Sequence, residues 1–321
     1  MPKDWADDAP RREKAGVPQD VEFATKPAIA LTQIEQLIAQ GAPKHCVLAD
    51  AGYGVDTAFR ERLSELGLPY VVGVTGAVTV WPPGHAPLPP PAYSGRGHVP
   101  TRLRLGDAKH QRPPSIKELA LELQPSQWHS VEWREGTNFT LRSRFARVRV
   151  RAAHREHLRT QQRPEQWLLI EWPEGHKEPM KYWLSTLAQD VSLQRMVFVA
   201  KMRWRIERDY QDLKQEVGLG HYEGRGWRGF HHHASLSIAA YGFLMAQQLR
   251  HPEGVGKKNA ARRQKPALPT HYKPRGSPAH AAPRSIVHHD FAAAYRRGLA
   301  QDAAPMYVLP ARKRKAALVT Q

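Results

Sequence analysis

Two acidic residues stand where a carboxylate could carry out chemistry. Asp50 follows the apolar run HCVLA (45–49) and precedes Ala-Gly-Tyr-Gly, which predicts a buried strand ending in a tight glycine turn. A carboxylate at the carboxyl end of a strand is in the usual place for a site in an open α/β sheet. An Asp that caps the following helix explains the same pattern equally well.

Glu207 lies in the stretch RWRIERDYQDLK (203–214), which we expect to be helical. Arg203 precedes it by about one helical turn and Lys214 follows it by about two, so the three residues share a face. An acid flanked by two bases suits a site in which the acid grips a metal ion and the bases hold phosphates. The alternative is a solvent-exposed face cross-linked by ion pairs.

A third segment, GLGHYEGRGWRGFHHH (218–233), mixes glycine, arginine, aromatic and histidine residues. Arg225 and Arg228 could contact a DNA backbone, and Trp227 could stack on a base. The three adjacent histidines are poor candidates for a metal site, because successive helical residues point about 100° apart.

The charge of the chain favours a polyanionic partner. The net charge is +18 with a pI near 10.2, and +11 of it falls in residues 251–321. Nucleic acid is the default partner for such a surface, although a basic tail can also be merely solubilising. No apolar run reaches the roughly 20 residues that span a bilayer, so we expect no membrane partner. The single cysteine, Cys46, excludes an internal disulfide and a cysteine-based zinc site.

The periodicity predicts helices and strands that alternate with short loops, which favours a parallel or mixed sheet covered by helices. Thr25 is a suitable N-cap for the first helix, and Ile29, Ile34, Leu37 and Ile38 should form its inward face. Residues 1–24 lack apolar periodicity. The expected helices are 25–40, 57–66, 115–123, 192–217 and 234–249, and the expected strands are 45–49, 68–74, 130–133, 139–150 and 167–171.

Taken together, these motifs resemble those of DDE transposases from bacterial insertion sequences. Asp50 with the following AGYG resembles their second-aspartate motif, and the spacing of Arg203, Glu207 and Lys214 is similar to the signature around their catalytic glutamate. Ala200 stands where that signature usually has a tyrosine. The segments KYWLS (181–185) and 218–244 also resemble the family, so the resemblance covers residues 1 to about 250.

The resemblance implies a ribonuclease H-like α/β fold in which three acids hold two divalent metal ions, Mg²⁺ or Mn²⁺, for DNA cleavage and strand transfer. Asp50 and Glu207 would be the second and third acids and metal ligands. The implied partner is the double-stranded DNA of transposon ends, bound by a homodimer, and the implied location is the cytoplasm at the bacterial nucleoid. The implied DNA contacts are Arg203, Lys214, Arg225, Trp227 and Arg228.

The first acid of the family lies on a core strand upstream of the helix predicted at 25–40. Asp4, Asp7, Asp8 and Asp20 precede that helix here, and none adjoins an apolar, strand-like run. We therefore expect an N-terminally truncated, catalytically inactive chain whose ribonuclease H-like core is incomplete.

Four parts of the chain are expected. Residues 1–74 would be the N-terminal part of the core carrying Asp50, 75–190 a β-rich insertion, 191–250 the C-terminal helical part carrying Glu207, and 251–321 a basic, proline-rich, disordered tail. Two other functions stay open. One is a non-catalytic basic DNA-binding protein, and the other is an unrelated RNA-binding protein, for which no module signature is present.

Overall fold

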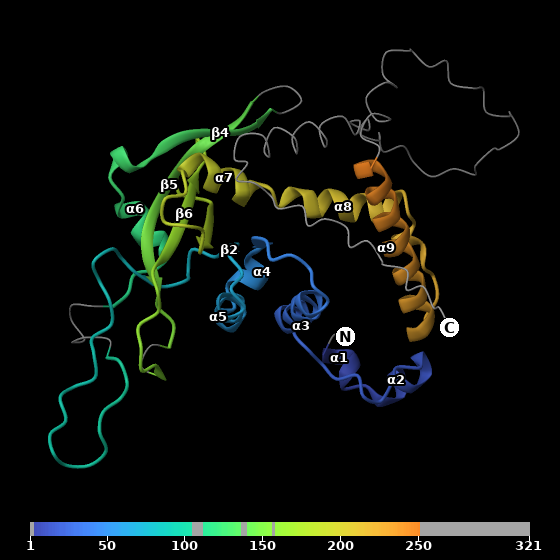
Figure 1. Cartoon of the computed structure of the whole chain (residues 1–321), viewed down its shortest axis with the longest axis horizontal. Helices are drawn as coiled ribbons and strands as arrows, with labels where there is room; N and C mark the ends of the chain where they lie inside the picture. Colours follow the sequence, from blue (N-terminus) through green and yellow to red (C-terminus); the bar gives the residue numbers. More distant parts are fainter. Residues whose placement is uncertain (1–2, 105–111, 136–139, 156–157, 251–321) are drawn as a thin grey trace, which may run out of the picture. The chain divides into compact units, whose positions relative to one another are not determined.

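A computed structural model describes residues 3–104, 112–135, 140–155 and 158–250 (Figure 1). The chain divides into two compact units, one of Met1–Glu216 with Gly220–His231 and the other of Val217–Leu219 with His232–Gln321. The tail expected at 251–321 lies outside the described residues. The helices are α1 (Lys3–Ala6), α2 (Ala9–Ala15), α3 (Lys26–Ala39), α4 (Ala51–Gly54), α5 (Thr57–Glu65), α6 (Ile116–Glu122), α7 (Leu193–Lys201), α8 (Trp204–Gln215) and α9 (Trp227–Arg250). The strands are β1 (Val47–Ala49), β2 (Tyr70–Val74), β3 (Val80–Trp81), β4 (His129–Glu135), β5 (Thr140–Ala152), β6 (Gln166–Trp172) and β7 (Lys181–Ser185).

The strands of the first unit form one mixed sheet (Figure 1). Its order is β1-β2-β7-β6-β5-β3, and β4 pairs with β5. β1 and β2 run parallel, while the other pairs are antiparallel. The expected α/β class is therefore confirmed, and the arrangement is that of a curled mixed sheet with helices.

The strands expected within 75–190 join the same sheet as β1 and β2. The connection is the β2–β7 pair, in which Val74 lies opposite Tyr182 and Val71 opposite Ser185. The segment KYWLS is thus a sheet strand, buried at all positions except Lys181. Whether this segment is an insertion in the evolutionary sense stays a prediction, but its strands extend one continuous sheet.

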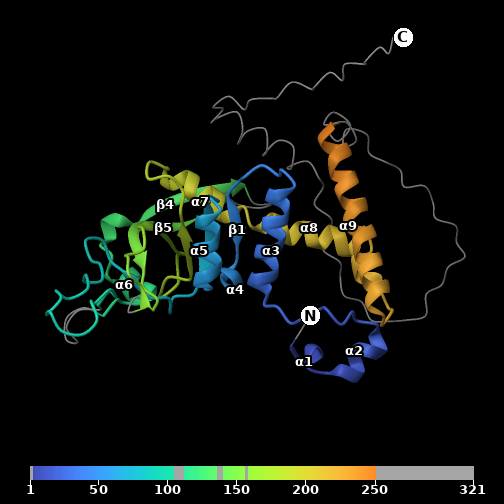
Figure 2. The ribbon, with the colours of Figure 1, turned by 60° about the horizontal axis from the view of Figure 1, so that its bottom comes forward.

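Helices cover both faces of the sheet. On one face α3, α5 and α6 pack on the even positions of β2 and β6, where Val72, Leu168 and Ile170 are buried. On the other face α7 packs through Met196 and Val197, against a set that includes Val71 and Leu169. Figure 2 shows α3 and α5 beside β1. Alternation along each strand divides the buried residues between these two layers.

The prediction for the first helix is right in its ends and partly wrong in its face. Thr25 caps α3 by accepting the backbone N–H of Ala28. However, Ile29 and Leu37 are 38% and 54% exposed. The inward stripe is made instead by residues one turn apart, and its members are Ala30, Leu31, Ile34 and Ile38.

The N-terminal segment contains two short helices where no element was expected. Asp8 caps α2 by accepting the N–H of Arg11, and Gly16 ends it with a positive φ of 67°. Arg12 donates to the carbonyls of Pro18 and Val21 at 3.1 and 2.8 Å. Capping and carbonyl contacts, rather than a buried apolar face, therefore define this segment.

The last described helix, α9, begins seven residues before the predicted start at 234. The run Trp227–His233, which is rich in aromatic residues and histidine, thus forms its first two turns. No helix in the described ranges combines the length and apolarity that crossing a bilayer requires.

Candidate active site

Asp50 directly follows β1 and caps α4. Its Oδ1 accepts the backbone N–H of Gly52 at 2.9 Å, and the residue is exposed. The expected glycine turn is therefore a one-turn helix, and the capping interpretation of Asp50 is observed. The preceding strand is only half-buried, because β1 is at the end of the strand order and pairs on one side only.

Two glycines allow the backbone of the turn after Asp50 to approach β2 closely. A Cβ on Gly54 would lie 1.9 Å from the carbonyl oxygen of Gly73, far inside any tolerated contact. A Cβ on Gly73 would lie 3.1 Å from the backbone nitrogen of Ala51. Arg60, a residue only 3% exposed, donates from its guanidinium to the Gly54 carbonyl. The AGYG pattern thus fixes the position of Asp50 relative to the sheet.

Glu207 lies in the first turn of α8 and is paired with Arg203. Arg203 Nη2 is 2.6 Å from Glu207 Oε1, and the Glu207 side chain is 65% exposed. The shared face predicted for Arg203 and Glu207 is therefore confirmed. Lys214 lies in the last turn, with its Nζ 5.9 Å from the centre of the Tyr210 ring.

An ion pair forms at Lys201, the last residue of α7, shortly before α8 begins at Trp204. Lys201 Nζ lies 2.6 and 2.7 Å from the two carboxylate oxygens of Glu171, whose side chain is 5% exposed. Three rings surround the ammonium, with centres at 4.3 Å for Trp133, 5.4 Å for Phe145 and 5.5 Å for Trp183. Burial lowers the pKa of Lys201, and Glu171 opposes that effect.

This ion pair brings the start of α8 to the end of the sheet that carries Asp50. Glu171 pairs with Lys181, the first residue of β7, and β7 begins where the parallel strands β1 and β2 end. In the strand order, β6 is three places from β1, or about 14 Å at the usual strand spacing. Asp50 and the Lys201–Glu171 pair therefore lie at the same end of the sheet, and the proximity of the Asp50 and Glu207 carboxylates stays a prediction.

The third predicted segment is held by local contacts. In the first unit, the Tyr222 hydroxyl donates to the carbonyl of Gly226 at 3.0 Å, and the ring of Trp227 lies 4.2 Å from that of His231. In the second unit, a ring nitrogen of His233 lies 2.9 Å from the carbonyl oxygen of Gly218. Trp227 and Arg228 begin α9 and Arg225 precedes it, and their contact with DNA stays a prediction.

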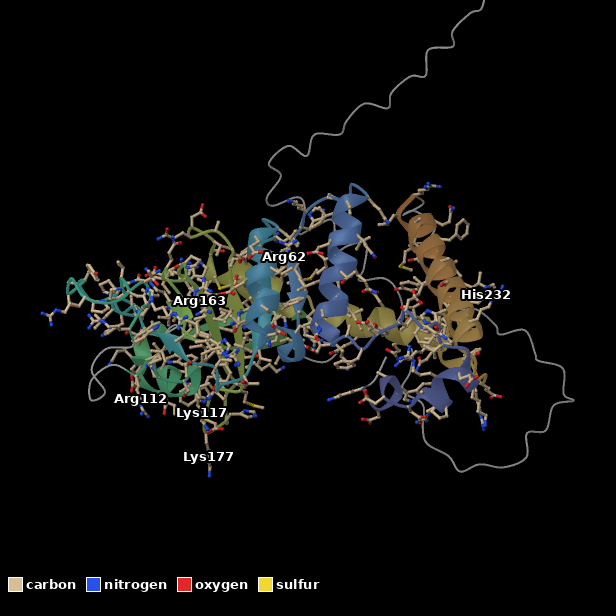
Figure 3. The ribbon with its side chains drawn as sticks, turned by 90° about the horizontal axis from the view of Figure 1, so that it is seen from below. Arg62, Arg112, Lys117, Arg163, Lys177 and His232 are labelled. Carbon is tan, nitrogen blue, oxygen red and sulfur yellow. The ribbon has the colours of Figure 1, made fainter. Side chains whose placement is uncertain are left out.

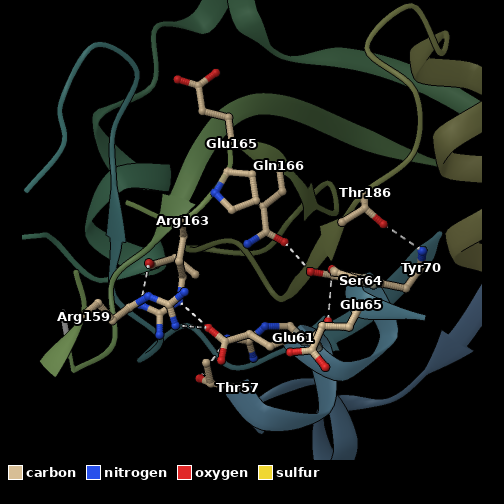
Figure 4. Close-up of a pocket in the computed structure, with 13 residues that line it drawn as sticks. Thr57, Glu61, Ser64, Glu65, Tyr70, Arg159, Arg163, Glu165, Gln166 and Thr186 are labelled. Carbon is tan, nitrogen blue, oxygen red and sulfur yellow. Dashed lines mark hydrogen bonds and ion pairs between the residues drawn. The ribbon is translucent and has the colours of Figure 1, made fainter. Parts of the chain in front are cut away.

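A cavity of about 300 Å³ opens beside α5 (Figure 4). It lies at the start of β2, and thus at the opposite end of the sheet from Asp50, which follows the end of the parallel strand β1. Its lining includes Tyr70 and Gln166, the first residues of β2 and β6, which share a hydrogen bond of 2.9 Å. Arg159 and Arg163 both donate to Glu61 Oε1, at 2.7 and 2.9 Å. These contacts link α5 to the β5–β6 connection, so the cavity is separate from the predicted acids.

The carboxylates of the described ranges do not make up a complete metal site. Within those ranges, no group of three or more His, Cys, Asp or Glu side chains is placed to share an ion. Asp50 and Glu207 are two acids where a two-metal centre of this kind uses three. The described residues therefore do not fit the metal pair that the resemblance implies.

The curled mixed sheet with its covering helices is an α/β fold consistent with the ribonuclease H-like class. Residues 1–140 match the family described as DDE superfamily endonuclease, and this match supports a DDE-type transposase family for the chain. The matched range contains Asp50, while Glu207 and the predicted DNA contacts follow it. No curated protein matches the chain significantly.

Two features of this part of the molecule were missed in the sequence analysis. The first is the Lys201–Glu171 ion pair, which no local pattern indicates because the two residues are 30 positions apart. The second is a row of arginines on β5. By contrast, the alternation Arg147-x-Arg149-x-Arg151 in β5 was a readable signal, because residues two apart on a strand share a face.

Proposed function

We propose that the protein acts on double-stranded DNA as a transposase-type protein, with Asp50 and Glu207 as two of its catalytic acids. The observation that supports this function best is the common sheet end of β1, with Asp50, and the Lys201–Glu171 pair from which α8 continues to Glu207. The family match and the net charge of +18 agree with a DNA substrate.

The finer parts of the proposal come from the resemblance. They are Mg²⁺ or Mn²⁺ as the bound ions, transposon ends as the DNA, a homodimer as the acting form and the cytoplasm at the nucleoid as the location.

A second candidate function is that of a non-catalytic DNA-binding protein. It is favoured by the lack of a three-residue metal-binding group in the described ranges. It also agrees with the engagement of Glu207 by Arg203, since a metal ion would have to compete with that ion pair.

Two measurements on the same preparation test the proposal. First, binding of a labelled DNA duplex should weaken steeply as salt rises from about 50 to 200 mM, because phosphate contacts release counterions. Second, plasmid nicking with Mg²⁺ or Mn²⁺ should be absent for the chain, because only two acids are identified. Glu207→Gln is the matched control, since it keeps the shape of the side chain and removes its charge.

Both candidates predict DNA binding without nicking by this chain, so the distance between the two acids is what separates them. No DNA binding at low salt contradicts both. Metal-dependent nicking that Glu207→Gln abolishes contradicts inactivity and supports the acid assignment. For proximity, a crystal structure with DNA and Mn²⁺ should place the Asp50 and Glu207 carboxylates about 4–8 Å apart, given metals about 4 Å apart. A much larger separation removes the shared site.

A further inference from the structure

Three arginines form a stripe along β5 on the sheet face that α7 partly covers. Arg147, Arg149 and Arg151 alternate with Val148 and Val150, which are buried on the opposite face. Neighbours in the stripe are about 6.7 Å apart along the strand, so three guanidinium groups fall within about 13 Å. We call these three residues the β5 arginine stripe.

Trp167, on the neighbouring strand, stacks with two of the three arginines without neutralising them. Its ring centre lies 4.6 Å from the guanidinium carbon of Arg147 and 4.9 Å from that of Arg149. The indole N–H donates to the carbonyl of Ala188 at 3.2 Å, which fixes the ring. A stacked arginine keeps its full charge and its outward N–H groups, so it remains able to bind an anion.

The other contacts of the stripe are mostly with neutral backbone oxygens. Arg147 donates to the carbonyl of Val191, Arg149 to that of Glu165 at 2.8 Å, and Arg151 to that of Arg163 at 2.7 Å. Carbonyl acceptors hold a guanidinium in place but leave its charge uncompensated.

One carboxylate serves the whole stripe among the described residues. Glu165 lies 3.2 Å from Arg151 and 3.8 Å from Arg149, and no ion pair in the described ranges involves Arg147. The stripe therefore carries a surplus of two positive charges. Arg149 and Arg151 keep 26% of their side-chain surface exposed. Beside Arg147 the surface is hollowed by about 330 Å³, next to His129 and Leu193.

We propose that the β5 arginine stripe contacts the phosphate backbone of double-stranded DNA. This inference rests on the proposed function and adds to it a surface outside the predicted DNA contacts. A row of charges within about 13 Å suits a polyanion with one charge per about 1.7 Å of axis, whereas one small anion could engage at most two neighbouring members. Contacts of this kind position DNA without reading its sequence.

The test compares salt dependence in matched double variants. Arg149→Gln/Arg151→Gln should lower the slope of log affinity against log salt by up to about 1.8, since each phosphate contact contributes about 0.9. Arg149→Lys/Arg151→Lys should keep most of the slope, because lysine binds phosphate as a point charge.

The control pair, Arg62→Gln/Lys177→Gln, removes the same charge elsewhere (Figure 3). Arg62 is on α5, which packs on the other sheet face, and Lys177 follows β6 at the end away from Arg151. The slope of log affinity against log salt for this control variant should match that of the unaltered protein.

The results distinguish failure of the inference about the β5 arginine stripe from failure of the proposed function. If the unaltered protein does not bind DNA, the proposed function itself fails. If it binds but the glutamine pair keeps the full slope, the function stands and the stripe is wrong. If the glutamine and lysine pairs lower the slope equally and both lower the melting temperature, the stripe stabilises the fold instead of binding DNA, which overturns the inference. Stripe-dependent binding of duplex RNA alone overturns it as well.

Discussion

Removal of one member of the buried Lys201–Glu171 pair should destabilise the protein, and removal of Lys201 should cost more than removal of the Glu171 charge. Lys201→Met leaves a carboxylate that is 5% exposed without its partner, and loss of one member of a buried pair costs about 3–5 kcal/mol. Glu171→Gln leaves the ammonium among three aromatic rings. That ammonium keeps its cation–π attraction to the rings, about 2 kcal/mol when desolvated, whereas Lys201→Met loses it.

We therefore expect Glu171→Gln to cost about 2 kcal/mol less than Lys201→Met. Urea unfolding followed by far-UV circular dichroism measures both free energies of unfolding, and avoids the fluorescence of Trp133 and Trp183 beside the pair. The double variant completes a cycle, and its coupling energy should be on the order of 2 kcal/mol. Equal losses of unfolding free energy in the two single variants, or a coupling energy near zero, would refute the argument from the three rings around Lys201.

The pH dependence follows from the lowered pKa of Lys201, whose main cause is burial. The unfolded chain binds more protons than the folded protein between the lowered pKa of Lys201 in the folded protein and its ordinary pKa of 10.5, so stability rises with pH in that window. The unaltered protein should therefore gain stability relative to Lys201→Met as pH approaches 10.5. A relative loss in that range contradicts this sign.

Two further predictions concern the turn after β1 and the thiol before it. Gly54→Ala should destabilise the protein by about 1–3 kcal/mol or more, since the new methyl group meets the Gly73 carbonyl oxygen, and the loss appears as a lowered urea midpoint. Gly226→Ala, with nothing within 4 Å, is the control, and equal midpoints for the two variants exclude the close approach. Burial raises the pKa of Cys46 to about 11, so a disulfide reagent at pH 8 should label it on the order of a hundredfold more slowly than an unhindered thiol. Fast labelling of the folded protein contradicts that prediction, and urea should restore the ordinary rate.

Short-range sequence signals determined the local features of the protein. Thr25 and the apolar positions around it gave the limits of α3, because a cap and its helix are neighbours in the chain. The apolar run before Asp50 gave β1, and the two glycines after it gave a tight connection. The spacing of Arg203 and Glu207 gave their shared face, since that spacing is one helical turn.

Only the tertiary structure decided which distant elements meet. Pairing of β2 with β7 joins residues 70–74 to 181–185, and no local pattern specifies a partner strand so far along the chain. The helix face of α3 depended on where the sheet lies, which left Ile29 and Leu37 outside. Lys201 and Glu171 meet because α7 packs on the face of the sheet that contains β6. Burial then makes the loss of either charge costly, since the other would remain unpaired.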